Sequence, residues 1–135
     1  MTSSRRQGRE AALQMIYLAD ICRLEVDKIP DAVLSDEPLA LKTREFARHL
    51  AAGTVSQWER IDQLITRHAK NWEMKRMATI DRCILRLASF ELLADLETPV
   101  NVIINEAVEI AKRYSTSDSS KFVNGILDKI KEERR

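Results

Sequence analysis

Residues 77–93 read MATIDRCILRLASFELL, a segment that is apolar around most of its circumference when it is wound as an α-helix. The polar side chains of Arg82, Arg86 and Ser89 fall within about 60° of arc, and Asp81 projects to one side. Water cannot cover so much apolar surface, so other helices must enclose this one. The segment therefore predicts a helical bundle built around residues 77–93.

Glu91 breaks the apolar pattern of that segment. Its side chain points the same way as Ile84 and Leu87, into the middle of the apolar face. A lone buried carboxylate costs several kcal/mol unless it is paired or hydrogen-bonded. Glu91 is either a catalytic acid or a carboxylate tied to an arginine or to a neighbouring helix N-terminus. The second interpretation is favoured, because no second acid, histidine or nucleophile is placed to work with Glu91.

The composition supports an all-helical domain. The 135 residues include only three glycines and three prolines, too few turn residues for a sheet, and the length suits one domain with a real core. With 22 basic and 21 acidic residues the net charge is +1, so any basic surface for a nucleic acid must be local.

The residues needed for common catalytic and metal sites are missing or badly placed. The three glycines are isolated, which excludes a P-loop and a dinucleotide fingerprint. His49 and His68 have no cysteine or carboxylate at ligand spacing, so neither a metal nor a cofactor is expected. A Ser-His-Asp or Cys-His arrangement is likewise unsupported. The sequence favours a binding module over an enzyme.

The cysteines and the hydropathy predict the compartment. Cys22 and Cys83 form no CxxC motif and lie on apolar faces of predicted helices, as is typical of buried, reduced thiols in a cytosolic protein. No apolar run approaches the ~20 residues of a membrane span, and the N-terminus lacks the apolar core of a signal peptide. We expect a soluble intracellular protein.

Periodicity and capping residues predict six or seven helices in one all-α domain, with residues 1 to about 70 as one half and about 75 to 135 as the other. Thr98 is expected to cap a helix that has Pro99 as its first residue. Gly53 is expected at a close packing point or kink, and Gly125 at a close approach of two helices. The expected helices span Ser3 or Ser4 to about Leu24, about 30–34 within a connector, 39–57, 57–70, 77–93, 99–114 and 118–131.

The start of the first helix is one candidate for anion binding. Arg6, Arg9 and Tyr17 lie within roughly 80° of arc, Arg5 projects nearby, and Tyr17 is about 12 Å further along the same side. Arginines bind phosphates bidentately, and a tyrosine ring offers a stacking face to an unpaired base. On these residues alone, a solvated basic N-terminus with a half-buried tyrosine is the favoured interpretation.

The segment YSTSDSSK at 114–121 is a second candidate. It ends one predicted helix and opens another, so free backbone N–H groups meet hydroxyl groups and a lysine, as in a phosphate cradle. Asp118 would repel an anion unless it accepts a hydrogen bond from a base or a ribose. Because Asp118 is also a good N-cap, plain helix capping is favoured on these residues alone.

Four segments in order resemble the NusB family of bacterial transcription antitermination factors, over nearly the whole chain. The resemblance implies an all-α fold of two small helical subdomains. It also implies binding to the boxA element of ribosomal RNA leader transcripts together with NusE, a ribosomal protein of the small subunit, in an antitermination complex with other Nus factors on RNA polymerase. The segments are RRQGREAALQMIY at 5–17, IDRCILRLASFEL at 80–92, TPVNVIINEAVEIAKRY at 98–114 and DSSKFVNGILDKI at 118–130.

The resemblance implies that eight residues face the RNA, in the same two places that the residues alone suggest. We expect capture of single-stranded RNA, modest without NusE, in the cytoplasm of a bacterium; a homodimer is an open possibility, and no membrane partner is expected. One alternative is a protein–protein scaffold with solvated arginines. Another is an accessory domain of an rRNA cytosine-5 methyltransferase, disfavoured because no cofactor-binding fold precedes Arg135. The eight residues that the resemblance places against the RNA are Arg5, Arg6, Arg9 and Tyr17, then Tyr114, Asp118, Ser119 and Lys121.

Overall fold

The computed structural model describes residues 3–22, 28–34 and 38–134. Within these ranges the chain forms seven α-helices and two short 3₁₀ turns, and contains no strand. This confirms the predicted all-α fold of six or seven helices. The elements are α1 (Ser4–Ile21), α2 (Ile29–Leu34), α3 (Leu41–Ser56), α4 (Trp58–His68), η1 (Met74–Arg76), α5 (Thr79–Ala94), α6 (Val100–Tyr114), α7 (Ser117–Ile130) and η2 (Lys131–Glu133).

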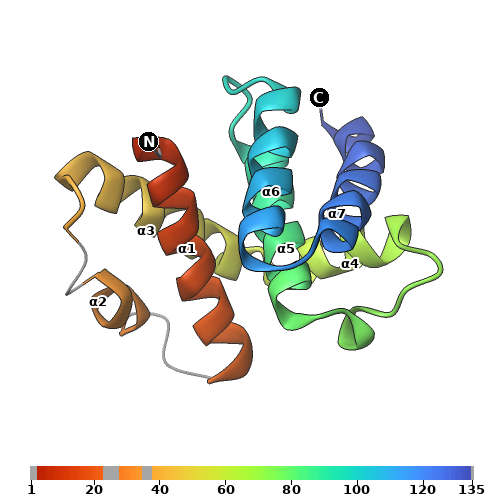
Figure 1. Ribbon diagram of the computed structural model, residues 1–135, viewed down its shortest axis with the longest axis horizontal. Coiled ribbons are helices and arrows are strands. Elements are labelled where there is room, and N and C mark those ends of the chain that lie inside the picture. Colours follow the sequence, from red (N-terminus) through yellow and green to blue (C-terminus); the bar gives the residue numbers. More distant parts are fainter. Residues whose placement is uncertain (1–2, 23–27, 35–37, 135) are drawn as a thin grey trace.

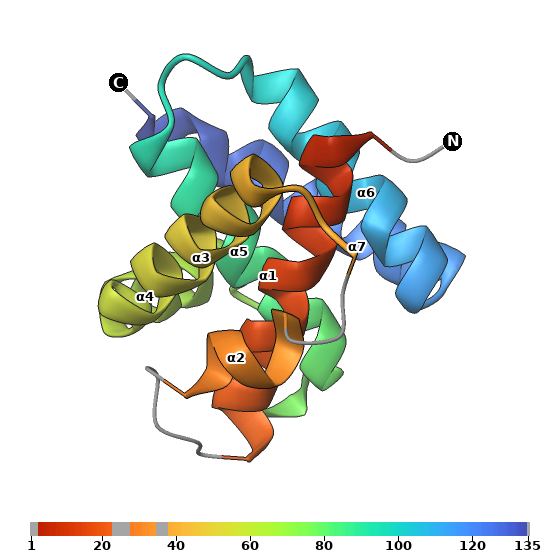
Figure 2. The ribbon, with the colours of Figure 1, turned by 90° about the vertical axis from the view of Figure 1, so that its left-hand side faces the viewer.

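Helix α5 lies at the centre of the molecule and contacts α1, α3, α4, α6 and α7. Helices α1 to α3 lie on one side of it, and α4, α6 and α7 lie on the other (Figure 1; Figure 2 shows the first group in front of α5). Every residue from 83 to 92 is buried, so the other helices enclose this segment as its composition predicts. Helix α4, which the sequence groups with the first half, packs against α5 and α7.

The polar stripe of α5 joins two other helices. Arg82 donates two hydrogen bonds to the carboxylate of Asp20 on α1, at 2.7 and 2.8 Å. Arg86 donates two to Asp62 on α4, at 2.7 and 3.0 Å, and a third to Asp20 at 2.7 Å, while its guanidinium lies 4.0 Å from the ring centroid of Trp58. The hydrogen bond from Arg82 lowers the pKa of Asp20 to about 2. These ion pairs therefore tie both α1 and α4 to α5.

The buried carboxylate of Glu91 is paired with an arginine, as the favoured interpretation predicts. Arg9 of α1 donates two hydrogen bonds to Glu91, at 2.8 and 2.9 Å, and the two side chains are only 6% and 2% exposed. Burial lowers the pKa of the Arg9 guanidinium, but the hydrogen bond and charge of Glu91 outweigh it, so this pKa is raised overall. The pair fastens the start of α1 to the end of α5.

Gly53 and Gly125, both within helices, differ in their surroundings. A Cβ atom on Gly53 would lie 2.1 Å from Cζ of Phe90, so α3 approaches α5 closely at this point, as predicted. Gly125 has no atom within 4 Å of the corresponding position and is exposed. The predicted close helix approach at Gly125 is therefore wrong, because α7 presents that residue to solvent.

Two predicted helix starts have different outcomes. The Ser3 side chain accepts a hydrogen bond from the backbone N–H of Arg6 and caps α1, as expected. The predicted capping by Thr98 is wrong: Pro99 is the N-cap residue of α6, which begins at Val100. The Thr98 hydroxyl donates instead to the carboxylate of Asp95, because the α5–α6 connection turns tightly there.

The predicted burial of both cysteines is right for Cys83 and wrong for Cys22. Cys83 is fully buried on α5, and its pKa is raised to about 12 by burial and by the charge of Asp20. Cys22 is exposed because α1 ends at Ile21, and Leu24, its predicted last residue, lies outside the described residues.

In the described part of the chain, no helix has both the length and the apolar character needed to span a bilayer.

Candidate nucleic-acid interface

One face of α1 lies against the end of α6. Arg6, Glu10, Leu13 and Tyr17 share this face because they recur every three or four residues. Nε of Arg6 donates to Oε2 of Glu106 on α6 at 2.6 Å. The start of α1 and the start of 114–121, which the sequence singles out, are adjacent in space because Glu10 contacts Tyr114.

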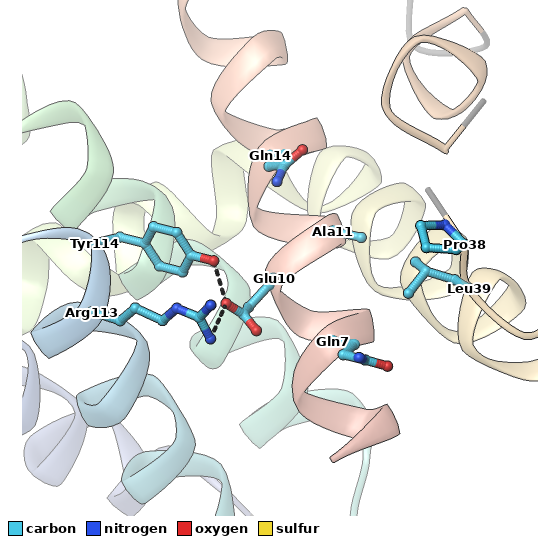
Figure 3. A pocket seen from close by; sticks show the side chains of 8 residues that line it. All are labelled: Gln7, Glu10, Ala11, Gln14, Pro38, Leu39, Arg113 and Tyr114. Carbon is cyan, nitrogen blue, oxygen red and sulfur yellow. Dashed lines mark hydrogen bonds and ion pairs between the residues drawn. The ribbon is translucent and has the colours of Figure 1, made fainter. Parts of the chain in front are cut away.

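Glu10 makes the contact between these segments. Its carboxylate accepts a hydrogen bond from the hydroxyl of Tyr114 and lies 3.3 Å from a guanidinium nitrogen of Arg113. Figure 3 shows both side chains pointing from the end of α6 to Glu10, with Gln7 and Gln14 along α1 on either side of it. A hollow of about 220 Å³ runs across this part of α1 as far as Leu39.

Arg5 and Arg9 differ from Arg6 in their surroundings: Arg5 lies against α3, and Arg9 lies inside, bound to Glu91 of α5 and 3.9 Å from Glu106 of α6. Arg9 is 5% exposed and bound to Glu91, so its predicted contact with phosphate does not fit this structure: its guanidinium is buried and already paired with a carboxylate. Arg5 is exposed, and its guanidinium lies 4.1 Å from the ring centroid of Phe46 on α3. Of the three opening arginines, Arg5 and Arg6 remain within reach of a ligand.

Tyr17 and Tyr114 line the same apolar hollow. This hollow has a volume of about 290 Å³ and lies between α1, the start of α5 and the end of α6. Tyr114 is 44% exposed and Tyr17 is half-buried against the core. The two rings come from helices far apart in the sequence, and together they offer aromatic surface to a planar group. The other lining residues are Glu10, Leu13, Gln14, Leu18 and Ile80.

The turn between α6 and α7 is attached to the start of α5. Thr116 caps α7 by accepting a hydrogen bond from the backbone N–H of Ser119 at 2.9 Å, so the prediction that Asp118 is the cap is wrong. The hydroxyl of Ser119 donates to Oδ2 of Asp81 at 2.8 Å. Asp118 and Lys121 are exposed on the first two turns of α7. The capping role of Thr116 thus leaves the Asp118 carboxylate on the surface.

Carboxylates that neutralise the arginines are the part of this surface that the sequence does not predict. Glu106 pairs with Arg6, and Glu10 pairs with Arg113. Glu10 could have been found, because it lies one helical turn after Arg6 on the same face. Glu106 could not, because its position depends on how α6 packs beside α1.

The arrangement suits binding of an anionic, aromatic ligand. It brings two accessible arginines, a lysine, two tyrosine rings and a surface carboxylate along neighbouring parts of α1, α6 and α7. Phosphates, bases and ribose hydroxyl groups match these side chains. In the described ranges, no group of three or more histidine, cysteine, aspartate or glutamate side chains is placed to hold a metal ion.

Known proteins resemble this chain over almost its whole length. A family model described as the NusB family matches residues 6–132. The transcription antitermination protein NusB of Geobacter sulfurreducens is 47% identical over 128 residues, which cover 94% of this chain and 93% of that protein.

Solved structures agree in fold. NusB of T. maritima superposes with a TM-score of 0.90 and 40% identity, covering 99% of this chain and 94% of that one. A chain in a crystal structure of the antitermination factors NusB and NusE in complex with dsRNA has a TM-score of 0.89 and 25% identity, with 98% and 99% covered. Since the family model spans residues 6–132 and a relative is 47% identical over 93% of its length, the chain belongs to the NusB family.

Proposed function

We propose that this protein is a transcription antitermination factor that binds the boxA element of ribosomal RNA leader transcripts together with NusE. It acts in the bacterial cytoplasm, in a complex with other Nus factors on RNA polymerase, and supports transcription of rRNA operons. The observation that carries the proposal is the contact between the start of α1 and the end of α6 through Glu10, Arg113 and Tyr114. Relatives named as antitermination proteins, and the related NusB–NusE complex with dsRNA, support it.

Each accessible side chain has a role in RNA binding. Arg5, Arg6 and Lys121 bind phosphates, and the rings of Tyr17 and Tyr114 stack on bases. The Asp118 carboxylate and the Ser119 hydroxyl oxygen accept hydrogen bonds from base edges or ribose hydroxyl groups, and Arg9 holds α1 in place through Glu91. The residues on α7 that bind RNA are Asp118, Ser119 and Lys121.

Arg6 must exchange one anion for another when RNA binds. Its guanidinium is bound to Glu106 in the free protein, at 2.5 Å between Nη2 and Oε2. A phosphate oxygen competes with this carboxylate for the same donors, so the RNA gains less from Arg6 than from an unpaired arginine. The protein alone is therefore expected to bind RNA modestly, and NusE adds contacts.

The tyrosine hollow favours a single strand over a duplex. A base must leave its helical stack before an aromatic ring can stack on it, and the bases of a duplex are already stacked and paired. The hollow of about 290 Å³ between Tyr17 and Tyr114 is open to solvent along these rings. We therefore propose that the bound boxA segment is unpaired.

A titration of fluorescently labelled boxA RNA at several salt concentrations tests the function, with and without NusE. With about three phosphate contacts, the logarithm of the binding constant should fall with the logarithm of salt with a slope of about −2. Lys121→Ala should make the slope shallower by about 0.7, whereas Lys129→Ala, a control at the far end of the same helix, should not. RNA binding that is absent or independent of salt would replace the proposal by a protein–protein scaffold.

The role of Asp118 and the strand preference have separate tests. Asp118→Asn should change RNA affinity and leave the thermal unfolding midpoint nearly unchanged, because Thr116 is the cap. Asp128→Asn, which removes an exposed charge from the same helix, is the matched control. A duplex of the same sequence should compete poorly with the labelled single strand. Stronger competition by the duplex would contradict the single-strand proposal and leave RNA binding itself in place.

A further inference from the structure

A second hollow adjoins the proposed RNA surface on the far side of Asp118. It has a volume of about 340 Å³ and lies between the α4–α5 connection, the start of α5 and the first turns of α7. We call it the Trp72 hollow. Six of the residues that line it matter here: Trp72, Arg76, Asp81, Asp118, Ser119 and Phe122.

Two aromatic rings form one wall of the Trp72 hollow. Trp72 is 57% exposed, and its ring centroid lies 5.3 Å from that of Phe122 with an angle of 73° between the planes. The backbone N–H of Trp72 donates to the carbonyl of Ala69, which fixes the residue just beyond α4. A tryptophan so exposed leaves a large apolar surface in water although a neighbouring ring is in contact with it. This surface is available for stacking.

Asp81 lines the same hollow and carries an unsatisfied acceptor. The residue is 6% exposed, and its Oδ2 accepts the hydrogen bond from Ser119. Its Oδ1 is buried and has no hydrogen-bond partner among the described residues. Buried polar atoms are nearly always hydrogen-bonded in folded proteins, so a lone carboxylate oxygen at the wall of a hollow indicates a donor from outside the protein.

We propose that the Trp72 hollow holds an unpaired RNA base. The base stacks on Trp72, whose ring is supported by Phe122, an N–H group on its edge donates to Oδ1 of Asp81, and Arg76 binds an adjacent phosphate. This inference rests on the proposed RNA binding and extends the path of the strand beyond Asp118 and Ser119, which line the same hollow.

The chemistry of the hollow fits a nucleotide better than a protein side chain. A nucleotide supplies an aromatic face, N–H donors on its edge and a phosphate, and the hollow offers a partner for each. The guanidinium of Arg76 is 78% exposed, and its contact to Glu73 is a long 4.0 Å, so a phosphate can bind it. An apolar side chain from a protein partner would cover Trp72 but leave Oδ1 of Asp81 without a donor.

Trp72→Ala tests the stacking, with Leu96→Ala as a matched control. Both residues are 57% exposed, but Leu96 lies after the end of α5, whereas Trp72 lies before its start. With a boxA single strand and the full chain, Trp72→Ala should weaken binding about 5- to 100-fold without changing the salt slope. Trp72→Phe should recover part of the affinity, and Arg76→Ala should make the slope shallower by about 0.7.

A scan of abasic nucleotides identifies the base that occupies the hollow. Removal of that one base should weaken binding to the wild-type protein and have no further effect on Trp72→Ala, because the same stacking interaction is lost in both. Asp81→Asn should change the preference among the four bases at that nucleotide only. Circular dichroism melting of each variant separates these effects from unfolding.

Three outcomes overturn the inference. If the wild type binds RNA but Trp72→Ala binds equally well, the hollow is not an RNA site and the proposed function stands. If Trp72→Ala weakens NusE binding and leaves RNA binding unchanged, the hollow is a protein-docking surface. If the wild type binds no RNA with or without NusE, the inference and the proposed function fail together.

Discussion

The two ends of α1 are both ion-paired to α5, with the charges reversed. At the N-terminal end, Arg9 of α1 binds Glu91 of α5; at the C-terminal end, Asp20 of α1 binds Arg82 and Arg86 of α5. Because residue 9 faces 91 and residue 20 faces 82, the helices are antiparallel; a reversed packing would oppose like charges, and a shifted one would separate the pairs. Charge complementarity therefore sets the register of the central helix pair.

The ends differ in what surrounds these ion pairs. Asp62 and the ring of Trp58 close the C-terminal cluster, and its side chains face other helices. At the N-terminal end the pair of Arg9 and Glu91 is buried, but Arg5 and Arg6 extend beyond it to the surface. The ion pairs at the C-terminal end of α1 are therefore enclosed by other helices. At the N-terminal end, the ion pair is buried and two arginines lie on its solvent side.

The helix dipole explains why these outer cations indicate a ligand. The first turn of α1 holds no acidic residue, although the N-terminal end of a helix favours negative charge by about 0.3–1 kcal/mol per group. Arginines in this turn do not stabilise the helix. A bound phosphate would be stabilised by the arginines and by the helix end together.

The largest effect should come from breaking the buried pair. Glu91→Ala leaves the Arg9 guanidinium buried without its partner, so the free energy of unfolding should fall by about 3–5 kcal/mol in urea denaturation. Glu109→Ala, at an exposed position on α6, should change it by less than about 0.5 kcal/mol. The double variant Arg9→Met with Glu91→Leu should recover most of the stability and keep the RNA salt slope. A shallower slope in that variant would mean that Arg9 contacts phosphate.

Asp20→Asn should have a smaller effect that depends on pH. The pKa of Asp20 is lowered from 3.8 to about 2 in the folded protein, so its ionised form contributes stability above pH 4 that is lost as the pH falls through 2. The wild type should exceed the variant by about 2 kcal/mol at pH 6, and the difference should shrink between pH 4 and 2. Urea denaturation at a series of pH values measures this. A difference that does not vary with pH would contradict the assignment to the charge of Asp20.

Glu106→Gln should have a modest effect on the outer side of the N-terminal end. It removes the anion that competes with RNA phosphate for Arg6, so affinity for boxA RNA should rise about two- to five-fold. Glu109→Gln removes the same charge one turn further along α6 and serves as the control for general repulsion. Equal gains from both variants would show that Arg6 is not the residue released.

The smallest perturbation probes the closed end by thiol reactivity. Cys22 is exposed at the C-terminus of α1, while Cys83 is fully buried with a pKa of about 12. At pH 8 a disulfide reagent should modify one thiol per native chain and two in urea, since only about 10⁻⁴ of Cys83 is thiolate. In Cys22→Ser the native protein should not react. Rapid reaction of that variant would show that α1 and α5 separate transiently and expose Cys83.

Much of the fold follows from local pattern. Apolar side chains around 83–92 predict a central enclosed helix, the helical periodicity predicts the other helices, and the lone Glu91 predicts a buried partner such as an arginine. The site is only partly predictable. The candidate surface residues are visible as residue types at helical spacing, but the sequence does not separate Arg9, which is buried, from Arg5 and Arg6.

By itself the sequence determined that the chain is helical and which segment is central, because these depend on side chains a few positions apart. Only the tertiary structure decided which cation faces which carboxylate. The pairs of Arg6 with Glu106 and Arg9 with Glu91 join residues 100 and 82 positions apart. Such contacts depend on how whole helices pack, since moving one helix by a turn exchanges every partner across it.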